Sequence, residues 1–137
     1  DQVRLMEVSN KVSLVAKEPL FRQFMVAKQR QLGEKGNVVM DGRDIGSVVF
    51  PDATIKFFIE ASMEVRAKRR FAELTQKNID VSLSDVISNI ENRDHIDSSR
   101  DDSPLVIPEN AIILTNNEYG LSHLLEVAIS KIDSLNQ

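Results

Sequence analysis

The chain has 137 residues, a net charge of −4 and no cysteine, so it is long enough for one domain with a hydrophobic core and has no disulfide or thiolate chemistry. The negative charge argues against a general nucleic-acid binder, and no apolar stretch approaches the ~20 residues of a membrane-spanning helix. We therefore expect a cytoplasmic protein without a membrane partner, because a chain without cysteine suits a reducing compartment.

Two helices are predicted for the first part of the chain. Apolar residues recur with helical spacing from Val3 to Val15, and a break is expected before Pro19. Pro19 suits the first turn of a second helix, which ends before a turn at residues 33–36. The sequence opens in a helical pattern without an initiator methionine, so we expect it to be an internal piece of a longer protein.

Three short apolar runs predict buried strands of a parallel sheet. They are Val38–Met40, Thr54–Ile59 and Ala111–Leu114. Ser62, Ser82 and Ser122 are expected to cap the helices that follow, and Ser82 has the capping-box spacing to Asp85. This alternation predicts an α/β fold with a mostly parallel sheet. Three strands are fewer than the ~5 of an average sheet, which again suggests that an N-terminal part is missing.

The segment Asp41-Gly42-Arg43-Asp44 follows the first predicted strand. Ligands of open α/β sheets bind just beyond the carboxyl ends of the strands. At such a place Asp41 can hold a hydrated Mg²⁺ and Arg43 can form a bidentate contact with a phosphate. The alternative is a strand that ends in a turn with a surface ion pair, because Asp and Gly favour turns. The tetrapeptide alone does not separate the two interpretations.

The segment at about 93–108 is polar, charged and bounded by proline, so we predict a loop or a mobile lid. Where helical geometry continues into its start, Arg93 and Asp97 lie four residues apart on one face, with Arg100 one turn beyond. Two arginines that flank an aspartate can clamp a phosphate while the carboxylate accepts a sugar hydroxyl. Taken alone, the segment favours the alternative of a solvated helix end with an exposed ion pair.

Arg66 and Arg70 share one face of the helix predicted after Ser62 and can reach a polyphosphate together. Taken alone, this segment favours a solvated basic face, and nucleic-acid binding is disfavoured because only Phe71 offers an aromatic platform. None of the five glycines opens a Gly-x-x-x-x-Gly-Lys-Ser/Thr loop. A nucleoside triphosphate site that this loop completes therefore cannot be whole in this sequence.

Three segments together resemble the signature of bacterial-type cytidylate kinases. They are Asp41 to Ala53, Glu64 to Phe71, and Arg93-Asp94 with Arg100 and Ser103-Pro104-Leu105, and Arg22 and Gln29-Arg30 also fit. The resemblance covers essentially the whole chain, residues 1–137, and implies the C-terminal part of such an enzyme with a lid at about 93–108. It implies a three-layer P-loop-kinase-like parallel sheet flanked by helices, here without its first strand and phosphate-binding loop.

The resemblance also implies an activity and the residues that carry it. Such kinases transfer the γ-phosphoryl group of ATP to CMP or dCMP with Mg²⁺. By position, the residues that read the cytosine ring are resembled by Ser13, Arg22 and Asp44. Arg43 and Arg93 resemble the residues that bind the CMP phosphate. Asp97 and Arg100 resemble the pair that holds the sugar hydroxyls, and Arg100 also serves the phosphates. Arg66 and Arg70 resemble arginines on the ATP side. Asp41 resembles the carboxylate that orients hydrated Mg²⁺, so Arg93, Arg100 and Asp41 are the implied catalytic residues.

We expect the isolated chain to lack kinase activity, because the loop that clamps the transferred group is missing. A second chain, or a part of the protein outside this sequence, would have to supply the missing N-terminal segment. One alternative is an inactive truncated module that binds a cytidine nucleotide or self-associates through an open sheet edge. Another is a kinase of the same superfamily with a different acceptor, such as UMP or dephospho-coenzyme A.

Overall fold

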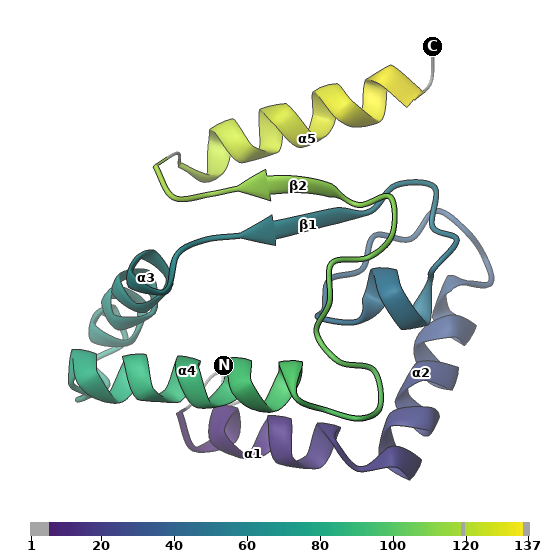
Figure 1. Ribbon diagram of the computed structural model, residues 1–137. Helices are drawn as coiled ribbons and strands as arrows, with labels where there is room; N and C mark the ends of the chain where they lie inside the picture. The colour runs from purple at the N-terminus through teal and green to yellow at the C-terminus, as the bar shows by residue number, and fades with distance from the viewer. Residues whose placement is uncertain (1–5, 119, 136–137) are drawn as a thin grey trace.

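The computed structural model describes residues 6–118 and 120–135 and shows helices around a small parallel sheet (Figure 1). In chain order the elements are α1 (Met6–Ala16), α2 (Pro19–Gly33), one turn of π-helix termed η2 (Ile45–Val49), β1 (Phe57–Glu60), α3 (Met63–Gln76), α4 (Leu83–Ser98), β2 (Ile112–Thr115) and α5 (Leu121–Leu135). None of these described helices has the length and apolar character that crossing a membrane requires.

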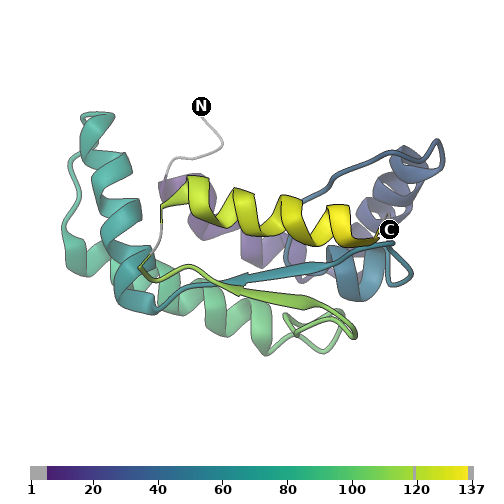
Figure 2. The ribbon, with the colours of Figure 1, turned by 90° about the horizontal axis from the view of Figure 1, so that it is seen from above.

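The sheet consists of β1 and β2, which run parallel in a register from Phe57 opposite Ile112 to Glu60 opposite Thr115. Parallel strands need a long crossover, and α3 and α4 provide it here. The two strands lie between α5 on one side and the pair α1 and α4 on the other (Figures 1 and 2). The predicted α/β class with parallel strands is therefore confirmed, although β1 begins three residues and β2 one residue later than expected.

The predicted strand at Val38–Met40 is wrong. Among the described residues the sheet has only two strands, and the segment 38–40 is irregular. Val38 and Val39 are exposed rather than buried. An extended segment becomes a strand only when its N–H and C=O groups find a partner edge, and the segment has none in this sheet.

The structure confirms two of the three predicted N-terminal caps. Ser62 Oγ accepts a hydrogen bond from the Val65 N–H at 3.3 Å and begins α3. Ser82 and Asp85 form a reciprocal capping box at the start of α4. Ser122 does not cap α5, because the helix already begins at Leu121 and Ser122 lies inside its first turn.

Helix α4 is longer than predicted, because it continues through Ser98 into the segment expected to be a loop. Residues 93–98 are helical, and the irregular part of the segment begins at Ser99. The i,i+4 pair of Arg93 with Asp97 and the hydrogen bond from Ser98 Oγ to the Asp94 carbonyl at 2.6 Å support this last part of the helix. The extension places Arg93 and Asp97 on the helix, whereas Arg100 lies just beyond its end.

The buried apolar core is small. The fully described residues with less than a tenth of their surface exposed and an apolar side chain are Val49, Ala67, Leu74, Val86 and Leu114. Three of them belong to α3 and α4, which pack against one another, and α4 in turn packs against α1. These helices form the scaffold for the charged residues described next.

Candidate functional site

Four arginines and two aspartates from separate parts of the chain meet near the C-terminal end of α4. They form the arginine–aspartate cluster: Arg22 on α2, Arg43 and Asp44 directly before η2, Arg93 and Asp97 on α4, and Arg100 just beyond it. All six were predicted as site residues from the sequence. The structure brings them together through ion pairs between residues far apart in the chain.

Asp97 is the centre of the cluster and is almost fully buried, with 2% of its surface exposed. Its Oδ2 lies 2.6 Å from Nε of Arg43 and 3.8 Å from Nε of Arg93. Its Oδ1 lies 3.4 Å from Nη1 of Arg100. One carboxylate therefore faces three guanidinium groups, and it can balance the charge of only one of them.

Arg22 and Asp44 form the second ion pair of the cluster. Nη2 of Arg22 is bonded to Oδ2 of Asp44, and both side chains are largely shielded from solvent. Nη1 of Arg22 also donates to the carbonyl of Ala16 at the end of α1, at 3.0 Å. The pair thus presents a donor and an acceptor side by side, held in place by α1 and α2.

The cluster has an excess of positive charge, since four guanidinium groups face two carboxylates. Burial, followed by the positive charge of Arg43, lowers the pKa of Arg93. Burial, followed by the positive charge of Arg22, lowers the pKa of Arg100, and neighbouring carboxylates oppose both effects. Arginine nevertheless stays protonated in proteins. Keeping Arg93 and Arg100 protonated in this place therefore costs free energy, and a bound anion would reduce that cost.

Two buried donors of the cluster have no acceptor. The Nε–H groups of Arg22 and Arg100 are shielded from solvent and find no hydrogen-bond partner among the described residues. An unsatisfied buried donor typically costs about 1–3 kcal/mol. A ligand with several acceptor oxygens or ring nitrogens would satisfy such donors, which points to a binding site.

Arg66 and Arg70 on α3 lie next to the cluster. Nη1 of Arg66 is 2.7 Å from Oδ2 of Asp94, the residue that follows Arg93 on α4. Arg70 pairs with Glu73 at 2.7 Å, and its charge is near enough to contribute to the lowered pKa of Arg93. The two arginines therefore extend the positive region from α4 onto α3.

Besides Arg66 and Arg70, two more of the predicted site residues are not among the six of the cluster. Asp41 is exposed and takes part in no ion pair among the described residues, and it does not follow a strand as expected. The described residues contain no group of three or more His, Cys, Asp or Glu side chains arranged for a metal ion. Ser13 lies in α1, but its side chain is outside the described part of the structure.

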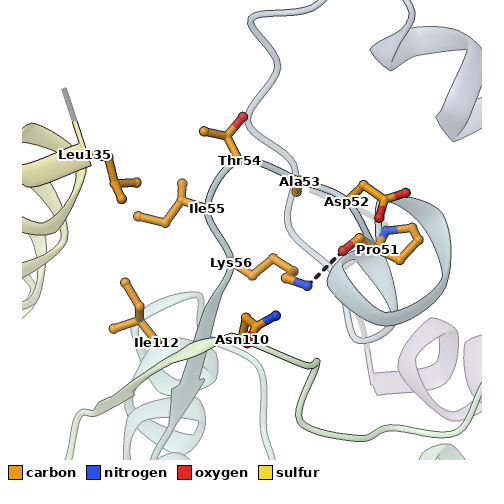
Figure 3. Close-up of a pocket in the computed structure, with 9 residues that line it drawn as sticks. All are labelled: Pro51, Asp52, Ala53, Thr54, Ile55, Lys56, Asn110, Ile112 and Leu135. Carbon is orange, nitrogen blue, oxygen red and sulfur yellow. Dashed lines mark hydrogen bonds between the residues drawn. The ribbon is translucent and has the colours of Figure 1, made fainter.

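A separate hollow of about 450 Å³ lies at the amino-terminal ends of β1 and β2 (Figure 3). Its lining runs from Pro51 to Lys56 and includes Asn110, Ile112 and Leu135. The Lys56 ammonium group donates to the Pro51 carbonyl at 2.8 Å, so it is already engaged. No residue of the arginine–aspartate cluster lines this hollow, and we do not assign the site to it.

Sequence patterns gave no role to Arg30, which contacts the segment after Asp44. Its guanidinium donates to the carbonyls of Val48 and Val49 at the end of η2. The π-helical turn itself was not predicted either. The only signal in the sequence was that Arg30 belongs to a stretch that fits the family pattern.

Comparison with known proteins shows which family the sequence matches. The family model described as cytidylate kinase matches residues 1–134. A protein named cytidylate kinase from Parabacteroides distasonis is 50% identical over 88% of this chain and 52% of its own length. Proteins of the same name from Flavobacterium johnsoniae and Bacillus subtilis are 52% and 42% identical, over 96% and 97% of this chain. The chain spans 60% and 59% of those two relatives, so it matches between half and two thirds of the length of each.

Proposed function

This chain belongs to the cytidylate kinase family, a family of P-loop nucleotide kinases, and we propose that it carries the acceptor side of a cytoplasmic enzyme that phosphorylates CMP or dCMP. The reaction transfers the γ-phosphoryl group of ATP and gives ADP with CDP or dCDP. The observation that supports this most strongly is the positive excess of the arginine–aspartate cluster, together with its unsatisfied buried donors.

The acceptor phosphate is assigned to Arg43, Arg93 and Arg100. Arg43 and Arg93 are 38% and 31% exposed at their side chains, so an anion can reach them. Phosphoryl transfer needs in-line positioning and neutralisation of the equatorial oxygens more than covalent chemistry from the protein. Arginines held in place before the substrate arrives supply this at no reorganisation cost. Of the segment at about 93–108, the irregular residues after Ser98 would act as a lid that excludes water.

The base is assigned to the pair Arg22–Asp44, with Ser13 as a further contact by family resemblance. Cytosine has an amino group that can donate a hydrogen bond to a carboxylate. The guanidinium of Arg22 can donate to the neighbouring acceptors of the ring. Uracil has a carbonyl oxygen where cytosine has the amino group, so Asp44 would disfavour it. Asp97 would hold a sugar hydroxyl by giving up one of its arginine contacts.

ATP is assigned to the side of Arg66 and Arg70, with Asp41 holding hydrated Mg²⁺ through water once the nucleotide is bound. An exposed carboxylate suits this outer role, since Mg²⁺ usually keeps several of its waters. Mg²⁺ would neutralise charge on the ATP phosphates. The sequence contains no phosphate-binding loop, so we propose that the chain by itself binds CMP without turning it over.

Calorimetry with CMP, UMP and cytidine tests the assignment of phosphate and base. We expect CMP to bind most tightly, UMP to bind less tightly because of Asp44, and cytidine to bind least because it has no phosphate. Arg43→Met should weaken CMP binding, whereas Arg69→Met should not, because Arg69 contacts Asn116 outside the cluster. Equal affinities for CMP and cytidine would overturn the phosphate assignment. CMP-dependent formation of ADP by the pure chain would overturn the proposed inactivity.

A further inference from the structure

Arg30 on α2 binds the end of the π-helical turn η2. Its Nε donates to the Val49 carbonyl at 3.1 Å and its Nη2 donates to the Val48 carbonyl at 2.7 Å. Carbonyls at the end of a helix have no partner within the helix and carry partial negative charge. The fork of a guanidinium can bind two such carbonyls at once, which a single lysine ammonium does less well.

The turn held by Arg30 is joined directly to Asp44. The N–H groups of Val48 and Val49 both donate to the Asp44 carbonyl, at 2.8 and 3.2 Å, and the Phe50 N–H donates to Ile45 at 2.7 Å. Turns of π-helix are rare and are frequently found at functional sites. Because the turn is hydrogen-bonded throughout, a displacement of its far end would also move the backbone of Asp44.

Helix α2 therefore holds both ends of the segment 44–50. Arg22 pairs with the side chain of Asp44 at the start of the segment. At its end, Gly33 lies so close to the Phe50 ring that a Cβ at this position would be 2.5 Å from a ring carbon. Arg30 binds between these two points, so the same helix fixes the segment at three places.

We propose that Arg30 is a positioning residue for nucleotide recognition: it holds η2 against α2 and thereby aims Arg43 and Asp44 at the nucleotide. This inference rests on the proposed function, because Arg43 and Asp44 are assigned there to phosphate and base. Arg30 itself takes no part in the ion pairs described for the cluster. Its effect on binding would pass through the backbone between residues 44 and 50.

The variants Arg30→Met and Arg30→Lys test the inference in the intact chain by calorimetry with CMP and UMP. Arg30→Met removes both donors and should weaken CMP binding about tenfold, since hydrogen bonds from charged groups are among the stronger ones. Arg30→Lys should recover part of the loss. Lys28→Met is the matched control on the same helix, because among the described residues Lys28 interacts with the exposed Gln31 side chain at 3.3 Å and the Phe24 ring, not with η2.

The ratio of CMP to UMP affinity separates positioning from general support of the fold. A misplaced Asp44 lowers this ratio, whereas a loss of stability alone leaves it unchanged. Arg30→Met should also speed hydrogen exchange at the amides of Val48, Val49 and Phe50, with or without nucleotide. The role of Arg30 would be overturned if hydrogen exchange at these amides were unchanged in Arg30→Met. It would also be overturned if the parent chain binds CMP and the variant keeps both the CMP affinity and the ratio of CMP to UMP affinity. Failure of the parent chain to bind CMP would instead overturn the proposed function.

Discussion

The arginine–aspartate cluster and helix α5 reverse the usual distribution of charged and apolar side chains. Arg22 and Asp97 are 7% and 2% exposed, although both carry a charge. The apolar residues along one face of α5 are 41–79% exposed: Leu121, Leu125, Ile129, Ile132 and Leu135. Burying charge is unfavourable unless it is paired, and burying apolar surface is the main favourable term of folding. The cluster is therefore maintained at a cost in stability, which is typical of a functional region.

The two regions also differ in how each is held. Every carboxylate of the cluster contacts at least one guanidinium group, and the contacts join α2, α4 and the segment before η2. In α5 the apolar residues recur at helical spacing, yet none of its fifteen described residues is buried. Substitutions should consequently have large effects in the cluster and small ones along α5.

Asp97→Asn should have the largest effect, because it leaves three guanidinium groups without their shared counter-charge. Breaking a buried ion pair from one side typically costs about 3–5 kcal/mol, and we expect a loss of this size in the free energy of unfolding. Urea denaturation of the parent and the variant measures it. The control is Asp94→Asn, whose carboxylate is 30% exposed and pairs with Arg66, and which should cost below about 1 kcal/mol. Similar losses in both variants would contradict the central role of Asp97.

Leu74→Ala and Leu125→Ala compare the core with the apolar face of α5. Leu74 is fully buried on α3, so its truncation should cost about 2–5 kcal/mol. Leu125 is 58% exposed, and its truncation should change the free energy of unfolding by less than about 1 kcal/mol. Urea denaturation again gives both numbers. A large loss for Leu125→Ala would mean that the face of α5 is covered in solution, and the contrast between the two regions would disappear.

Sequence patterns predicted most of the fold because its helices and strands have local signals. Ser62 and Ser82 supply side-chain caps, and the apolar runs near β1 and β2 supply two strands. The segment Val38–Met40 has the same apolar character but is not a strand. Pairing depends on a neighbouring edge and not on the segment itself, so no local pattern could have distinguished it.

The candidate site could be predicted only in part from residue spacing. Arg93 and Asp97 are four residues apart on a helix, and their contact follows from that spacing. The pairs Arg22–Asp44 and Arg43–Asp97 join residues from different elements, so only the tertiary structure reveals them. The roles assigned to these residues in binding nucleotide stay predictions.

A double-mutant cycle on Arg22 and Asp44 should give the next effect in size. Arg22→Met leaves a largely buried carboxylate without its partner, and we expect a coupling of about 1–3 kcal/mol with Asp44→Asn. The control cycle uses Lys68 and Glu64, an exposed i,i+4 pair at 2.6 Å on α3. Its coupling should vanish in high salt, since exposed charges are screened. Equal salt sensitivity in the two cycles would show that Arg22–Asp44 behaves as a surface pair.

Ser82→Ala should have the smallest effect and should separate the two ends of α4. Ser82 donates to Asp85 through both its hydroxyl and its N–H, and these hydrogen bonds lower the pKa of Asp85 below its ordinary value. Because the folded pKa is lowered, the stabilisation is present above the unfolded pKa of about 3.8 and is lost as the pH falls through the folded value. The variant should raise the pKa of Asp85 in an NMR titration and reduce this dependence in acid. Asp97 lies more than three turns away on the same helix, so CMP affinity near neutral pH should stay unchanged. A loss of CMP affinity in Ser82→Ala would mean that the cluster side chains are held in position by the stability of α4 as a whole and not by the ion pairs at its end.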